Sequence, residues 1–89
     1  MLNDKNLTSN VFENMQAIKG ETIKGVIAIQ GTDSDDWLIV FETGYSLQIH
    51  PKIGAFWINN KAKTKQLISS EVSRRSALIE NLEEVQKLL

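Results

Sequence analysis

The sequence predicts a single α+β domain in which one helix, a four-stranded antiparallel meander and a second helix follow one another (α-β-β-β-β-α). Through the middle of the chain apolar residues recur at every second position, which is typical of strands, whereas near both ends they recur at helical spacing. No repeat or Pro- or Gly-rich linker divides the 89 residues. We therefore expect residues 1–89 to form one folding unit.

The first element is predicted as a short helix over residues 10–19. Asn10 can cap it, and Glu13 can reach back to complete a capping box. Gly20 can supply the left-handed position that often ends a helix. The apolar stripe of this helix, which we expect to face the sheet, consists of Val11, Met15 and Ile18, with Leu7 and Phe12 at its margins.

Residues 23–29 are predicted to form the first strand, because isoleucine occupies three of its odd positions. Turn-forming residues at 31–36 separate it from a second strand that begins at Trp37. The third strand is predicted over residues 45–49, where large apolar side chains alternate with polar ones.

The connection after Phe41 sets the pairing of the second and third strands. A two-residue loop would pair Glu42 with Tyr45. A three-residue loop, with Gly44 in a left-handed conformation, would instead pair Phe41 with Tyr45. We prefer the second loop, because it places every large apolar residue of the third strand opposite another. The predicted core face then consists of Trp37, Ile39, Phe41, Tyr45, Leu47 and Ile49.

A five-residue turn over residues 50–54 is predicted to lead into the fourth strand. Pro51 cannot donate to a strand ladder, and Gly54 permits a positive φ. This turn would pair Leu47 with Trp57 and would bring Trp57 to the core face.

The lysine-rich residues 59–66 are predicted as a loop. Ser69 or Ser70 could then cap a final helix that runs to the C-terminus. Its apolar positions are Val72, Leu78, Ile79, Leu82, Val85 and Leu89. We expect both helices to pack on one face of the sheet, and the alternative is that they divide between the two faces.

Composition argues against several classes of protein. The chain has no cysteine, so neither a disulfide framework nor a thiolate zinc site is available. It has no run of about 18 apolar residues and no apolar segment like that of a signal peptide at its start. A cytoplasmic location without membrane contact is expected.

Two polar groups are candidates for chemistry. The acidic residues 33–36 could ligate a cation, but their spacing fails the calcium-loop pattern, so a solvated turn is the better interpretation. His50 could act as a general base only with an orienting carboxylate and a nucleophile, for which Ser46 is a candidate. We interpret His50 as a turn residue and predict no enzyme activity, no metal and no cofactor.

The leading hypothesis is a non-catalytic protein-interaction module. Apolar residues occupy the second sheet face as well as the predicted core face, and such a patch on a small protein often marks an interface. A homodimer through this face or the C-terminal helix is expected, with an unidentified protein partner as the alternative. The predicted interaction surface comprises Val26, Leu38, Val40, Phe56, Ile58, Leu82 and Leu89.

Two other functions stay open. The first is binding of a small ligand in a pocket between sheet and helices, lined by Trp37, Tyr45 and Trp57. The second is nucleic-acid binding through the basic segment 52–75, which is disfavoured because no known binding motif is present.

Overall fold

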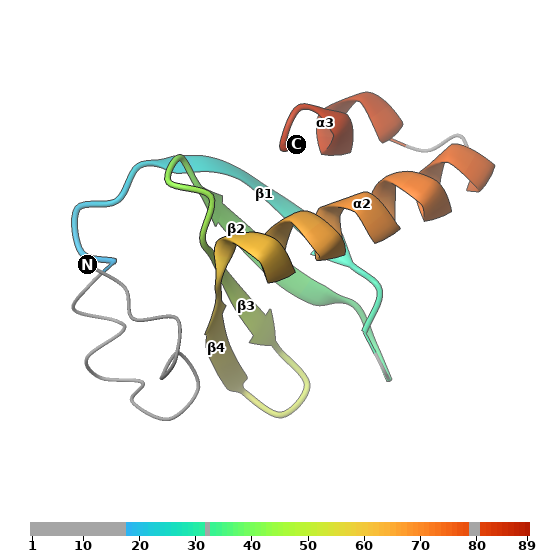
Figure 1. Ribbon diagram of the computed structural model, residues 1–89. Helices are drawn as coiled ribbons and strands as arrows, with labels where there is room; N and C mark the ends of the chain where they lie inside the picture. The colour runs from blue at the N-terminus through green and yellow to red at the C-terminus, as the bar shows by residue number, and fades with distance from the viewer. Residues whose placement is uncertain (1–17, 32, 79–80) are drawn as a thin grey trace.

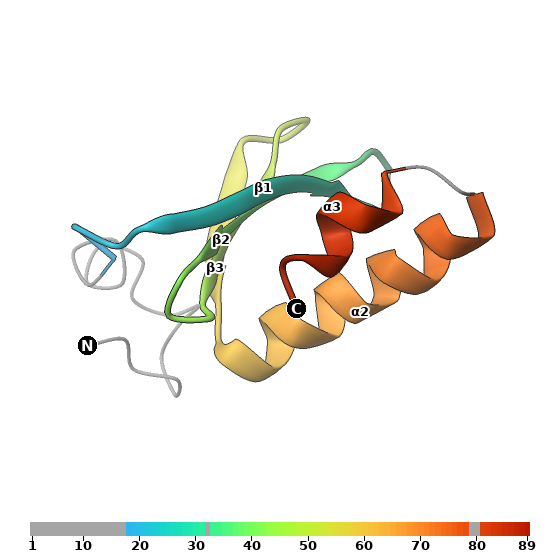
Figure 2. The same ribbon diagram turned by 90° about the horizontal axis from the view of Figure 1, so that it is seen from above.

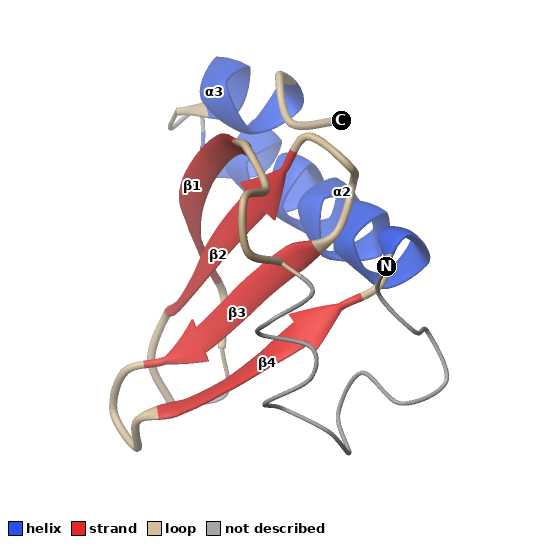
Figure 3. Ribbon diagram, turned by 90° about the vertical axis from the view of Figure 1, so that its left-hand side faces the viewer, coloured by secondary structure: helices blue, strands red, loops and turns tan. Residues whose placement is uncertain are grey.

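The computed structural model describes residues 18–31, 33–78 and 81–89 of the chain (Figure 1). Its elements are β1 (Ile23–Ile29), β2 (Asp36–Phe41), β3 (Ser46–His50), β4 (Ala55–Asn59), α2 (Lys61–Leu78) and α3 (Leu82–Gln86). The strands form one antiparallel sheet in the order β1-β2-β3-β4, with the helices behind it in Figure 3. The four-stranded meander followed by helix is thus confirmed. The helix predicted over residues 10–19 lies, except for its last two residues, outside the described part.

The β2–β3 hairpin has the predicted three-residue loop. Trp37 pairs with Ile49 and Ile39 with Leu47. The Phe41 N–H donates to the Tyr45 carbonyl (2.9 Å), which closes the loop. Gly44 has a φ of 97°, in the left-handed region that glycine adopts without steric cost. The predicted register of this hairpin is therefore confirmed.

Substituting Gly44 by alanine should test the loop. The new Cβ would adopt an unfavourable left-handed conformation and would lie 3.3 Å from the Lys61 Cγ. We expect a loss of about 1–2 kcal/mol in the free energy of unfolding, measured by urea denaturation. Thr43→Ala, at an exposed position of the same loop, should cost less than about 0.5 kcal/mol. Equal losses for the two variants would contradict the left-handed loop.

The register predicted for β3 and β4 is wrong by one residue. Leu47 pairs with Ile58 rather than with Trp57. The connection contains the four residues 51–54, and the Gly54 N–H donates to the His50 carbonyl (2.9 Å). A slip of one residue moves every side chain of a strand to the other face. Trp57 consequently shares a face with Gln48, its partner on β3.

The prediction of which sheet face forms the core is also wrong. Both α2 and α3 lie on the side of the sheet that carries Leu38 and Val40, which we call the inner face (Figure 2). Leu38 is fully buried, whereas Trp37 is 50% exposed on the opposite, outer face. Of the six residues predicted for the core face, Phe41 alone is buried. The core cluster consists of Ile27, Ile29, Leu38, Val40, Ile68, Val85 and Leu88.

Helix α2 begins within the segment predicted as a loop. The Asn60 Oδ1 accepts a hydrogen bond from the Lys63 N–H (2.8 Å), so Asn60 caps the helix. The predicted caps, Ser69 and Ser70, lie inside it. The buried residues of α2 are Thr64, Ile68 and Glu71. They follow helical spacing, but two of them are polar. The apolar residues of this segment therefore do not form the stripe that predicts a helix.

A single helix to the C-terminus is not found either. Helix α2 ends at Leu78, and Asn81 takes a left-handed conformation (φ 51°) before α3. The chain then packs back against β1, where Leu88 lies so close to Gly25 that an added Cβ would be 2.5 Å from the Leu88 Cδ2. The described helices include none that is long and apolar enough to span a membrane.

Candidate functional site

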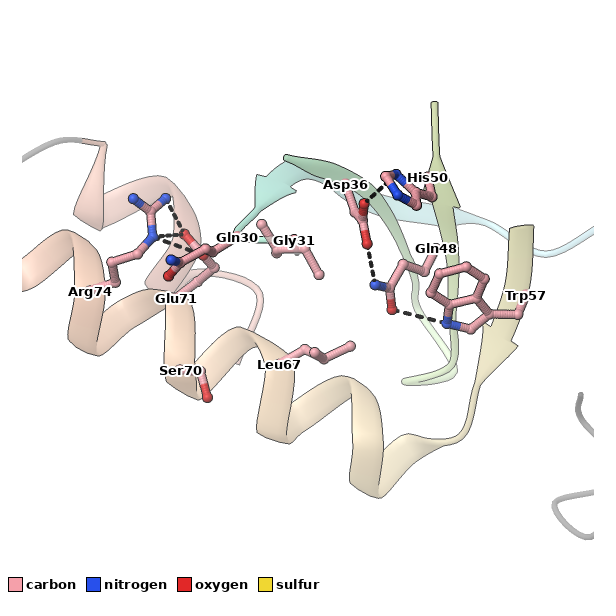
Figure 4. Close-up of a pocket in the computed structure, with 11 residues that line it drawn as sticks. Gln30, Gly31, Asp36, Gln48, His50, Trp57, Leu67, Ser70, Glu71 and Arg74 are labelled. Atoms are coloured by element: carbon pink, nitrogen blue, oxygen red, sulfur yellow. Dashed lines mark hydrogen bonds and ion pairs between the residues drawn. The ribbon is translucent and has the colours of Figure 1, made fainter. Parts of the chain in front are cut away.

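A pocket of about 490 Å³ lies between the inner face of the sheet and the middle of α2 (Figure 4). Residues from β1 to β4 line one side of it, and residues of α2 line the other. The apolar part of its wall is formed by Ile29, Trp57 and Leu67. The remainder of the wall is polar, so the arrangement of these polar groups determines what the pocket can bind.

Asp36, the first residue of β2, contributes a buried carboxylate that is only 6% exposed. Its Oδ2 accepts a hydrogen bond from the Gln48 Nε2 (2.8 Å). Its Oδ1 lies 3.2 Å from the His50 Nδ1, but the two atoms are not aligned as a hydrogen bond. Neither atom has a hydrogen-bond partner in the described part of the chain. An acceptor left unsatisfied in this way costs about 1–3 kcal/mol, so the Asp36 Oδ1 retains an unused capacity to accept a hydrogen bond.

A hydrogen-bond network holds this end of the pocket in place. The Gln48 Oε1 accepts from the Trp57 Nε1 and from the Asn59 Nδ2, both at 3.1 Å. The Asn59 Nδ2 also donates to the Ser46 Oγ (3.2 Å), and a hydrogen bond of 2.8 Å joins the hydroxyls of Ser46 and Thr64. Together with the Asp36–Gln48 hydrogen bond, this network links β2, β3, β4 and α2, and it fixes the Trp57 indole next to Gln48.

Glu71 occupies the α2 side of the pocket and is 3% exposed. It forms ion pairs with Arg74 (2.8 Å) and Arg75 (3.2 Å), and its Oε1 accepts the Gln30 N–H (2.8 Å). Burial by itself raises the pKa of Glu71. The hydrogen bonds from Arg74 and Gln30 and the charges of both arginines outweigh burial and hold this pKa below its ordinary 4.5. Glu71 is therefore a compensated carboxylate.

The three aromatic residues predicted to line a pocket do not come together. Trp57 lines the pocket described above. Trp37 lies on the opposite face of the sheet, paired with Ile49. Tyr45 is found near the start of α2, where the Lys61 Nζ lies 5.8 Å from the centre of its ring. Of the three, the structure therefore brings Trp57 alone to the pocket.

The seven residues predicted as an interaction surface do not share one face. Three are buried: Leu38, Val40 and Ile58. Three are exposed, namely Val26, Phe56 and Leu89, and Leu82 is partly buried. Val26 and Phe56 belong to the outer face, because they pair across the sheet in rows with Ile39 and Ile49. These seven side chains thus cannot form one contact surface in this fold.

Asp36 is the site residue that sequence reasoning missed. Asp33 and Asp35 are exposed, as expected for a solvated turn, whereas Asp36 is buried beside His50. The signal was present, since a register that pairs Trp37 with Ile49 also sets Asp36 next to His50. In the described part of the chain no three His, Cys, Asp or Glu residues are grouped so that they could hold a metal ion.

The basic segment 52–75 divides in the structure. Arg74 and Arg75 form ion pairs with the buried Glu71. Its lysines, at positions 52, 61, 63 and 65, are exposed. The two guanidinium groups therefore contribute to the fold.

Comparisons with protein-family models, curated proteins and solved structures found no match to this chain. Its function is therefore inferred from the geometry of the pocket.

Proposed function

We propose that the protein is a non-catalytic binder of a small molecule with a cationic N–H donor, such as an ammonium or amidinium group. The observation that carries this proposal is the buried Asp36 carboxylate, whose Oδ1 has no hydrogen-bond partner among the described residues. The pocket volume of about 490 Å³ supports it, because small-molecule sites typically measure about 300–1,000 Å³.

The distribution of charge favours a cation over an anion. Glu71 is compensated by two arginines, whereas the described contacts of Asp36 include no lysine or arginine. The Asp36 end of the pocket is therefore the more negative one. Figure 4 shows Trp57 at this same end, beyond Gln48. An aromatic ring near a carboxylate suits a nitrogen cation, because the ring face attracts positive charge.

The position of Ser46 supports a binding role without catalysis. Ser46 shares a strand and a face with His50 and was the candidate nucleophile. Its Oγ is instead hydrogen-bonded to Thr64 and Asn59. A nucleophile has to lie within hydrogen-bond reach of its base, and His50 has Asp36 as its described polar contact.

The test is a binding screen of small amines and amidines, matched with carboxylates and alcohols of the same shape, by ligand-observed NMR and calorimetry. We expect members of the cationic set to bind and the matched anions not to bind. Asp36→Asn keeps an oxygen that can accept from Gln48 but removes the charge. It should weaken binding about tenfold or more, since a hydrogen bond to a charged group contributes about 1.5–3 kcal/mol.

Asp33→Asn is the matched control, because it removes the same charge from an exposed turn position outside the pocket. Its affinity should equal that of the wild type. If no cation binds, or if the two substitutions weaken binding equally, Asp36 is not the ligand-holding group and the proposal fails.

A further inference from the structure

The outer face of the sheet carries two complete rows of apolar residues. Cross-strand pairing assembles the first row from Val26, Ile39, Leu47 and Ile58. It assembles the second from Ala28, Trp37, Ile49 and Phe56. Neither row contains a charged or polar side chain. This face is therefore more apolar than the inner face, which carries Ser46 and Gln48 under the helices.

The described helices do not cover these rows. Helices α2 and α3 both lie on the inner side of the sheet (Figure 2). Exposure along the rows is uneven: Val26, Trp37 and Phe56 are 53%, 50% and 43% exposed, whereas Ile58 is 4% exposed. A contiguous apolar patch of this kind on a small protein usually has an occupant.

The course of the chain before β1 points to the occupant. Strand β1 is an edge strand, and the Glu42 N–H donates to the Thr22 carbonyl (2.9 Å) just ahead of it. A turn precedes this contact, closed by the Glu21 N–H and the Ile18 carbonyl (3.0 Å), with Gly20 at a φ of 85°. The described chain thus turns at residues 18–21, directly beside the edge strand of the sheet.

We propose that the chain's own N-terminal segment, residues 1–17, docks on the outer face through the apolar stripe of the helix that its sequence predicts. The stripe contains Val11 and Met15, with Leu7 and Phe12 at its margins. Since α2 and α3 occupy the inner face, the outer face is the one that remains for it.

The dimensions agree with this occupant. A helix over residues 10–17, the part of the predicted helix that lies in this segment, would be about 12 Å long and about 10 Å wide. Four strands span about 14 Å from first to last, and rows two residues apart lie about 7 Å from each other. One short helix therefore covers both rows.

Cysteine cross-linking of the full chain tests the proposal, because the sequence contains no cysteine of its own. Met15→Cys combined with Phe56→Cys places one thiol on the stripe and one on the outer face. Met15→Cys combined with Ser73→Cys is the matched control, with the second thiol exposed on α2. Both variants are treated with a short bismaleimide at low protein concentration. We expect an intramolecular link in the first variant and little in the control.

Other outcomes would overturn the proposal. A covalent dimer of the Phe56→Cys single variant would identify a second copy as the occupant, and equal linking in both double variants would show unspecific contact. The absence of a link in both double variants would show that residues 1–17 do not dock on the outer face. Circular dichroism confirms that each variant is folded.

A second measurement does not depend on cross-linking. In a Trp57→Phe background, Trp37 is the single tryptophan and reports on the outer face. Met15→Asp should shift its emission to longer wavelength and increase its quenching by acrylamide. Gln16→Glu, which adds a charge off the stripe, should not. Identical spectra for the two substitutions would argue against docking.

Discussion

Leu38→Ala should lower the free energy of unfolding by about 3–5 kcal/mol, the largest effect expected for a single substitution in the core. Leu38 is fully buried in the cluster that joins the inner face to both helices, with Ile27 as its partner on β1. Truncation removes apolar contacts and leaves a cavity that close-packed surroundings cannot refill. The total free energy of unfolding of a small domain is only about 5–15 kcal/mol, so this loss should be easily measured by equilibrium urea unfolding.

Leu78→Ala provides the control for this substitution. It removes the same atoms from the last residue of α2, which is 55% exposed. We expect the free energy of unfolding to fall by less than about 1 kcal/mol, because the Leu78 side chain buries little apolar area in the folded protein. Similar losses at the two positions would mean that the inner face is not the core.

Glu71→Gln should cost about 3 kcal/mol at neutral pH. The substitution leaves Arg74 and Arg75 without their buried counter-charge. Breaking a buried ion pair usually costs about 3–5 kcal/mol. The lower end is expected here, because the Arg74 side chain is 33% exposed and can be hydrated. Glu83→Gln, at an exposed position of α3, is the matched control and should change stability by less than about 0.5 kcal/mol.

The same substitution should change how stability depends on pH. The pKa of Glu71 is lower in the folded protein than its ordinary 4.5, so the folded state binds this proton less readily. Its contribution to stability is therefore fully present above about pH 4.5 and is lost as the pH falls through the lowered pKa. Chemical denaturation from neutral pH to pH 3 should show the wild type losing more stability than Glu71→Gln. A difference between the two proteins that stays constant over this range would contradict the role of Glu71.

Local chemistry explains which parts of the fold were predictable. Alternation of apolar and polar residues predicts the strands. The β2–β3 loop is also predictable, because its conformation depends on a few neighbouring residues, among them Gly44 with its positive φ. The second turn is different, because Pro51 and Gly54 are compatible with either four or five residues. Because the turn is one residue shorter than predicted, each side chain of β4 lies on the face opposite to the predicted one, and Trp57 therefore lines the pocket.

The candidate site was harder to predict than the strands. Asp36 and Glu71 are buried charges, and burial of a charge depends on partners from other elements. Arg74 and Arg75 follow Glu71 by three and four residues, which is the spacing of neighbours on a helix. A helix through these positions therefore predicts both ion pairs. The hydrogen bond from the Gln30 N–H to Glu71 could not be predicted from the sequence, because the two residues are 41 positions apart in the chain.

The sequence by itself determined the four strands, the antiparallel meander and the register of β2 with β3, because these follow from alternation and from one glycine turn. Tertiary structure alone decided which face became the core. Both faces carry apolar residues, and a count of them favours the outer one. The helices nevertheless cover the inner face, where Ile68, Val85 and Leu88 pack on its apolar residues. Thr64 and Glu71 also find hydrogen-bond partners there, in Ser46 and in the Gln30 N–H after β1. Packing and polar partners across the whole chain, rather than local hydrophobicity, thus placed the pocket.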